Sequence, residues 1–366
     1  MKKILIIVYM VCILINLKSN VYANDLDNYI DEMQNYTNKI DLKKLSEDII
    51  ENKGIEPKTV ISSILNTFLK EVVLTFNSSI SIVVLIILVS LLKTFEISKN
   101  SGIIKVSNFV CILTLSILLL NNYKDVMNFF KDTSINLTTI MQVISPFLMG
   151  VLIATGKVTT VGIIQPLLLF LTSIMGYIIT NLVIPFLSLS ISLLVISSMN
   201  DNLKLNKLAK IFNTSVIWII GIIFTVFLGI LALETSITTS VDGLAIKTAS
   251  AAVSNFVPVV GKIFSDSLTA VVGASQIVGK TSGVIGIIVI LVIMAIPIIK
   301  IVTISVIYKV LTAILEPICD DSKLLKIIDS FSDIYKTMAG VLFGIGIIFI
   351  ISIGVILNIY GSVVGG

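Results

Sequence analysis

Between Leu74 and Asn358 the sequence consists mostly of long apolar runs, which limit the possible fold more than any other feature. About 20 helical residues are needed to cross the roughly 30 Å hydrocarbon core of a bilayer. Because lipid offers no hydrogen bonds, helices that pair their own backbone groups are favoured there. We therefore predict an all-α, polytopic transmembrane helical protein. The expected spans are Leu74–Leu92, Ile103–Leu120, Ser134–Ala154, Val161–Thr180, Leu182–Met199, Ile211–Leu233, Val284–Tyr308 and Met338–Asn358.

The low charge content excludes a soluble globular protein. Charged residues make up 13% of the chain, whereas soluble chains carry about 25%. The third expected span is the least apolar, since Gln142 and Pro146 interrupt it. Keeping this span places the lysines of residues 204–210 in the cytoplasm, where loops are richer in lysine. We therefore favour eight spans, with seven as the alternative.

The first 23 residues have the pattern of a cleavable secretory signal peptide. Lys2 and Lys3 precede the apolar core Ile4–Leu17, and Val21-Tyr22-Ala23 is a suitable cleavage sequence. An uncleaved anchor is the alternative interpretation. Either interpretation exports residues 24–73, a polar and mildly acidic segment with helical spacing of its apolar residues. We expect this segment to be a small extracytoplasmic helical domain, serving as a docking face or as a solvated spacer.

The remaining boundaries follow from the apolar runs. Residues 74–233 would hold transmembrane helices 1–6, and residues 284–366 would hold helices 7 and 8. Between them, residues 234–283 are rich in small side chains, which favours a pair of amphipathic helices on or dipping into the outer leaflet. A further amphipathic helix is expected in the cytoplasmic connection, either as a surface helix or as a partner-binding one. Its apolar stripe is Leu324, Ile327, Ile328, Phe331 and Tyr335.

The residue types needed for much enzyme chemistry are missing. The sequence contains neither histidine nor arginine, so the commonest general base and the bidentate phosphate clamp are absent. Removal of the signal peptide would leave a nearly neutral chain, which gives no reason to expect nucleic-acid binding. Ala274–Thr281 resembles a phosphate-binding loop, but it lacks the preceding buried strand that such a loop requires. We expect no enzymatic activity, no metal and no cofactor.

Within the apolar runs, Lys300 is the deepest charge, and it either snorkels to the interface or faces a cavity. Pro146, Pro166, Pro185 and Pro297 also interrupt apolar segments. Such breaks mark the substrate site in some transporters, although plain kinks are the commoner cause. Gly340 and Gly344 have the spacing of a helix-contact motif, whereas Gly279–Gly283 has the same spacing but suggests a turn.

Several unusual stretches resemble one protein family. The most specific are Val241–Ala249 (VDGLAIKTA) and Asn255–Ser267 (NFVPVVGKIFSDS). Ala295–Lys300 (AIPIIK) and Ile307–Pro317 (IYKVLTAILEP) continue the pattern, and QPLLLFL and VIPFL precede it at residues 165–171 and 183–187. From about Met141 to the C-terminus, the sequence resembles the stage III sporulation protein AE family.

That resemblance implies an integral membrane subunit of a sporulation channel, or feeding apparatus, in an endospore-forming bacterium. It would reside in the mother-cell membrane surrounding the forespore and support late forespore development. Implied partners are ring-forming membrane proteins and a secretion-type ATPase, and no catalytic residues carry over. The competing function is a secondary transporter whose site includes Lys300. As an interaction surface we expect Asp242, Lys247, Asn255, Pro258, Gly261 and Asp266, which otherwise cap and turn interfacial helices.

Overall fold

The computed structural model describes residues 30–31, 57–94, 101–200, 203–238, 258–317, 319 and 322–361. The predicted signal peptide lies outside these residues. Within the described part every regular element is a helix. These elements are α3 (Pro57–Thr94), α4 (Ser101–Ala154), α5 (Val158–Ile178), the π-helix η1 (Ile179–Val183), α6 (Ile184–Met199), α7 (Asn206–Thr238), α9 (Pro258–Leu315) and α10 (Ser322–Gly361).

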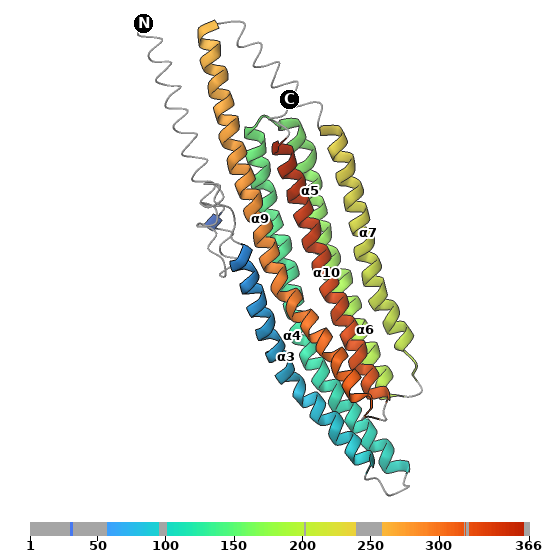
Figure 1. Ribbon diagram of the computed structural model, residues 1–366. Coiled ribbons are helices and arrows are strands. Elements are labelled where there is room, and N and C mark those ends of the chain that lie inside the picture. The colour runs from blue at the N-terminus through green and yellow to red at the C-terminus, as the bar shows by residue number, and fades with distance from the viewer. Residues whose placement is uncertain are drawn as a thin grey trace.

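The helices form an elongated bundle in which successive rods run in opposite directions (Figure 1). α5, η1 and α6 together make a single rod. α10 packs most extensively against α9 and also contacts α4 and α7, while α9 contacts α3 and α4 as well. Apolar side chains from all these helices form the buried core. The bundle is therefore organised around the α9–α10 pair.

Membrane insertion agrees with the length and composition of these helices. Five segments are long and apolar enough to cross a bilayer, and Val72–Leu88 of α3 is a shorter apolar helix. The five are Phe109–Ala154, Val158–Met199, Asn206–Ile230, Ile277–Leu315 and Lys323–Ile359. The predicted fold class, an all-α polytopic membrane protein, is confirmed.

The expected number of spans is wrong at α4. We predicted two spans separated by an exposed connection at residues 121–133, but α4 runs through this stretch as one helix of 54 residues. The physical reason is that the stretch is amphipathic. Tyr123, Val126, Met127 and Phe130 are all buried at helical spacing, while the charged residues between them are exposed.

A second pair of expected spans is also joined. Val161–Thr180 and Leu182–Met199 lie in the rod formed by α5, η1 and α6. Pro185 lacks a backbone N–H, and in an α-helix its ring would clash with the carbonyl oxygen of the residue four positions earlier. The π turn directly before this proline relieves the clash. The eight-span and seven-span alternatives therefore both disagree with the structure. In the structure residues 204–210 lie at the same end of the bundle as Lys323, and Lys157, between α4 and α5, lies at the opposite end.

Part of the predicted pair of amphipathic helices at residues 234–283 lies outside the described residues, namely residues 239–257, and the described parts of this stretch are extensions of longer helices. α7 continues to Thr238, and α9 starts at Pro258 and continues unbroken beyond Gly283. Proline suits the first position of a helix because its missing N–H would have no partner there. A Cβ on Gly283 would collide with Leu357 near the end of α10. From this level α9 extends about 30 Å beyond α10, at 1.5 Å per residue, and Figure 1 shows this projecting arm.

The expected cytoplasmic amphipathic helix is the first half of α10. All five residues of its apolar stripe are at most 4% exposed, because they pack inside this chain. The stripe is therefore core and offers no docking face for another protein in this structure. The predicted domain boundary at residue 73 also falls inside a helix, since α3 starts at Pro57 and continues to Thr94.

Close helix contacts explain part of the glycine pattern. A Cβ on Gly344 would come within 3.1 Å of Ile220 in α7, whereas Gly340 faces open space. Only the second glycine of the predicted motif therefore makes a helix contact. Gly279–Gly283, which we expected to form a turn, lies inside α9.

Candidate functional site

The six residues predicted as an interaction surface are only partly described. Asp242, Lys247 and Asn255 lie outside the described residues. Pro258, Gly261 and Asp266 lie in the first three turns of α9, on the projecting arm. The arm places these three positions beyond the end of α10, so they are separated from the core of the bundle.

Lys300 contacts an aromatic ring on a neighbouring helix. Its Nζ lies 4.8 Å from the ring centroid of Phe129 in α4, which is the geometry of a cation–π contact. Phe129 belongs to the stretch 121–133, in which α4 carries its exposed charges. Lys300 therefore lies level with a polar band of the bundle, and its ammonium has a structural partner.

The helix-interrupting prolines do not produce broken helices in the described residues. Pro146, Pro166 and Pro297 lie inside continuous helices, and Pro185 follows the π turn. Transport sites of the discontinuous-helix type depend on unwound backbone that exposes free carbonyl and N–H groups. No such unwound segment occurs within these described helices.

A cluster of aromatic rings fills the interior between α4, α9 and α10. The ring centroids of Tyr308 and Tyr335 are 5.7 Å apart, and Tyr123 and Phe331 lie 6.4 Å apart at an interplanar angle of 87°. Asn122 Nδ2 donates to the Tyr308 hydroxyl at 3.0 Å. Edge-to-face pairs at such distances are favourable. The cluster therefore fills the space between these three helices at the level of residues 121–133 of α4.

Two serines connect α9 to α10 through a pair of buried hydrogen bonds. Ser305 Oγ donates to the Ser332 carbonyl at 2.9 Å, and Ser332 Oγ donates to the Ser305 carbonyl at 2.7 Å. Small residues allow helix backbones to approach closely in membranes. This reciprocal pair fixes the register of the two helices that organise the bundle.

An exposed ion pair lies near the same level. Lys309 Nζ is 2.6 Å from Asp329 Oδ1 and 3.2 Å from Asp333 Oδ1. The three side chains are 42–55% exposed, and pairs of this kind contribute at most about 1 kcal/mol. The interaction nevertheless means that both carboxylates of α10 are engaged by a cation from α9.

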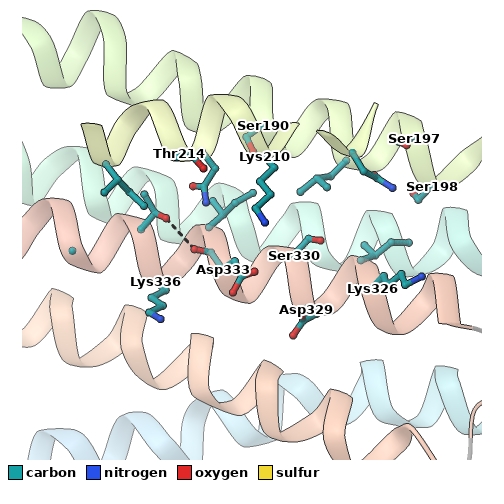
Figure 2. A pocket seen from close by; sticks show the side chains of 18 of the residues that line it. Ser190, Ser197, Ser198, Lys210, Thr214, Lys326, Asp329, Ser330, Asp333 and Lys336 are labelled. Carbon is teal, nitrogen blue, oxygen red and sulfur yellow. Dashed lines mark hydrogen bonds between the residues drawn. The ribbon is translucent and has the colours of Figure 1, made fainter. Parts of the chain in front are cut away.

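The described structure contains a cavity of about 930 Å³ between α6, α7 and α10. Figure 2 shows Lys210 of α7 extending into the space between α7 and α10, with Lys326 on the facing helix. The rest of the lining consists of hydroxyl side chains of α6, α7 and α10, an apolar wall, the amides of Asn206 and Asn213, and the carboxylates of Asp329 and Asp333. The lysines that line it are Lys204, Lys210, Lys323, Lys326 and Lys336.

Sequence reasoning did not identify this cavity. The lysines of residues 204–210 and 323–336 indicated only the orientation of the chain in the membrane. The spacing of three residues at Lys204, Lys207 and Lys210 did not identify it either, because Lys204 precedes α7 and Lys207 does not line the cavity. The segment that resembles a phosphate-binding loop, Ala274–Thr281, lies inside α9, so it forms no loop.

Comparison with known proteins gives one family. The model of the family described as stage III sporulation protein AE matches residues 40–359. The match begins well before Met141, where the resemblance first becomes apparent from motifs. A protein named stage III sporulation protein AE, from Bacillus subtilis (strain 168), is 26% identical over 275 residues, which covers 75% of this chain and 69% of the relative. No solved structure matches the chain.

Proposed function

Because the chain belongs to the stage III sporulation protein AE family, which indicates a role in sporulation, we propose that it is an integral membrane subunit of the channel joining mother cell and forespore. In this role it resides in the mother-cell membrane surrounding the forespore and is required for late forespore development. Its partners are the ring-forming membrane proteins and the secretion-type ATPase of the same apparatus. The chain itself carries out no catalysis, in keeping with a sequence that lacks histidine and arginine.

The observation that carries this proposal is the length of the apolar surface. On α4, Val106, Phe109 and Val110 are exposed near one end and Ile153 is exposed near the other. Val106 and Ile153 are separated by about 70 Å along the helix at 1.5 Å per residue, whereas the hydrocarbon core is about 30 Å thick. One bilayer cannot cover both ends, so protein partners cover the remainder.

The arm of α9 supports an assembly role at the opposite end from the lysine-rich connections. Lysine is enriched on the cytoplasmic side of membrane proteins, and residues 204–210, at the start of α7, lie at the same end of the bundle as Lys323 in the first turn of α10. On this orientation the arm, with Pro258, Gly261 and Asp266, faces the space between the two membranes. There it meets the ring-forming partners.

Two observations favour a subunit of an assembly over a self-contained transporter. The described helices remain continuous at their prolines, and the rings of Tyr123, Tyr308, Phe331 and Tyr335 fill the interior. Lys300, the residue on which the transporter alternative depends, is placed against Phe129. Replacement of Lys300 by Met is expected to leave both sporulation and the assembly intact. Loss of sporulation with an intact assembly would favour transport.

Site-specific photo-crosslinking in cells tests the assembly directly. A photoreactive residue is placed at Phe109 or at Ile153, and adducts are compared between sporulating cells and vegetative cells that produce the same chain. We expect protein adducts at one of the two positions only in sporulating cells, and lipid adducts at the other. Lipid adducts alone at both positions during sporulation would contradict the proposed function.

A further inference from the structure

We propose that the cavity between α6, α7 and α10 binds an anionic phospholipid, with the phosphate headgroup among the lysines and the acyl chains along α7. The volume of about 930 Å³ lies within the range of small-molecule sites and exceeds that needed for a single ion. The inference requires only that the chain inserts in a membrane, so it does not depend on the channel function.

The charge of the lining favours an anion. Five lysines line the cavity, against Asp329 and Asp333. Both carboxylates also contact Lys309, which approaches from α9. In Figure 2, the side chains of Asp329 and Lys336 point to the side of α10 away from α7, whereas Lys210 points into the cavity. The cavity is therefore positive, and lysine ammonium groups bind phosphate as point charges.

The apolar part of the lining favours a lipid over free phosphate. Leu194, Ile217, Ile220, Ile334 and Val341 form an apolar wall beside the lysines. Ile217 is 56% exposed, so the wall opens onto the outer face of α7. At helical spacing from Ile217 that face continues to Leu228, which is also exposed, and α7 is the least buried of the candidate spans. A lipid whose headgroup lies in the cavity can therefore place its acyl chains along this apolar face of α7.

A buried acceptor helps to define the headgroup. Asn213 Oδ1 is buried on the cavity wall and has no hydrogen-bond partner. Phosphate oxygens only accept hydrogen bonds, so they do not satisfy this atom, but a headgroup hydroxyl does. Basic pockets between membrane helices are known to hold lipid phosphate groups. Phosphatidylglycerol combines the required negative charge with hydroxyl donors.

The test measures lipid retained by the purified full-length chain in detergent, by native mass spectrometry, with dioleoylphosphatidylglycerol and zwitterionic dioleoylphosphatidylcholine as probes. The variant combines Lys204→Gln, Lys210→Gln and Lys326→Gln. The matched control combines Lys124→Gln, Lys131→Gln and Lys207→Gln, which removes the same charge from exposed positions that do not line the cavity. Each lysine is expected to contribute about fivefold. The cavity variant should therefore bind phosphatidylglycerol about a hundredfold more weakly, and the control should be unchanged.

Three results would overturn the proposal: equal retention of the two lipids, equal losses in the cavity variant and its control, or displacement of phosphatidylglycerol by excess inorganic phosphate. The third result would assign the site to free phosphate. Should the triple variant fail to fold, the single variant Lys210→Gln is compared with Lys207→Gln, one turn away on α7. If Lys210→Gln alone lowers the affinity for phosphatidylglycerol about fivefold, the site is supported. Equal effects of the two substitutions refute it.

Discussion

The serine pair between α9 and α10 allows a quantitative prediction about how two helices are held together in a membrane. Ser305 and Ser332 are 7% and 0% exposed, and each hydroxyl donates to the backbone carbonyl of the other residue. The two Oγ atoms are also 3.0 Å apart. Because a hydroxyl has one proton and both protons are donated to carbonyls, the Oγ–Oγ contact is not a third hydrogen bond.

The magnitude follows from this assignment of donors. Hydrogen bonds between membrane helices contribute about 0.6 kcal/mol on average and about 1.7 kcal/mol at most. Ser305→Ala removes one such bond, but Ser332 still donates to the carbonyl of residue 305, since alanine retains the backbone. Each single variant should therefore lose about 0.6–1.7 kcal/mol of unfolding free energy. The double variant should lose the sum, with a coupling energy below about 0.5 kcal/mol.

The assay is a double-mutant cycle of unfolding in mixed micelles with increasing sodium dodecyl sulfate, followed by circular dichroism. Ser192→Ala is the matched control, because Ser192 is exposed and its hydroxyl donates within its own helix to Ser188. Its effect should stay within about 0.5 kcal/mol. A coupling energy above about 1 kcal/mol would show that the two hydroxyls bond to each other, and the donor assignment would then be wrong.

Three further substitutions have expected outcomes in the same unfolding assay. Gly346→Ala should lower the unfolding free energy by about 1 kcal/mol, because the new Cβ displaces the flexible end of the Met294 side chain. Gly340→Ala, at a position that faces open space on the same helix, should not lower it. Tyr308→Phe removes the acceptor of a partly buried hydrogen bond and should cost about 1 kcal/mol; no change would show that this bond is not formed. Lys309→Met should lower the unfolding free energy by less than about 1 kcal/mol, and added salt should abolish this difference. A larger or salt-independent loss of stability would contradict the exposed position of Lys309.

The fold class was predictable from hydropathy, but the division into helices was not. A hydropathy average treats residues 121–133 as a polar gap because seven of these thirteen residues are charged or carry an amide. The helical spacing of Tyr123, Val126, Met127 and Phe130 indicated the continuous helix that the structure contains. Averaging discards this periodicity, so two expected spans proved to be one.

The lysine cavity was not predictable, because it depends on which helices are neighbours. Lys210 and Lys326 are separated by more than a hundred residues, and they come together only when α7 packs against α10. No local pattern in the sequence specifies that contact. The position of Lys300 was predictable only in part, since its depth in an apolar run was clear from the sequence but its aromatic partner, Phe129, was not.

The unbroken length of α9 has a mechanical consequence. A continuous helix of 58 residues is about 87 Å long, so a force applied at its first residue, Pro258, is transmitted along the bundle to the opposite end. Sharp bends in helices concentrate at prolines, and Pro297 is the interior proline of this helix. Because α9 packs against α10 at Gly283 and again at Met294, a sideways force on the arm bends the helix at the level of Gly283, and Pro297 lies deeper, within the packed part of α9.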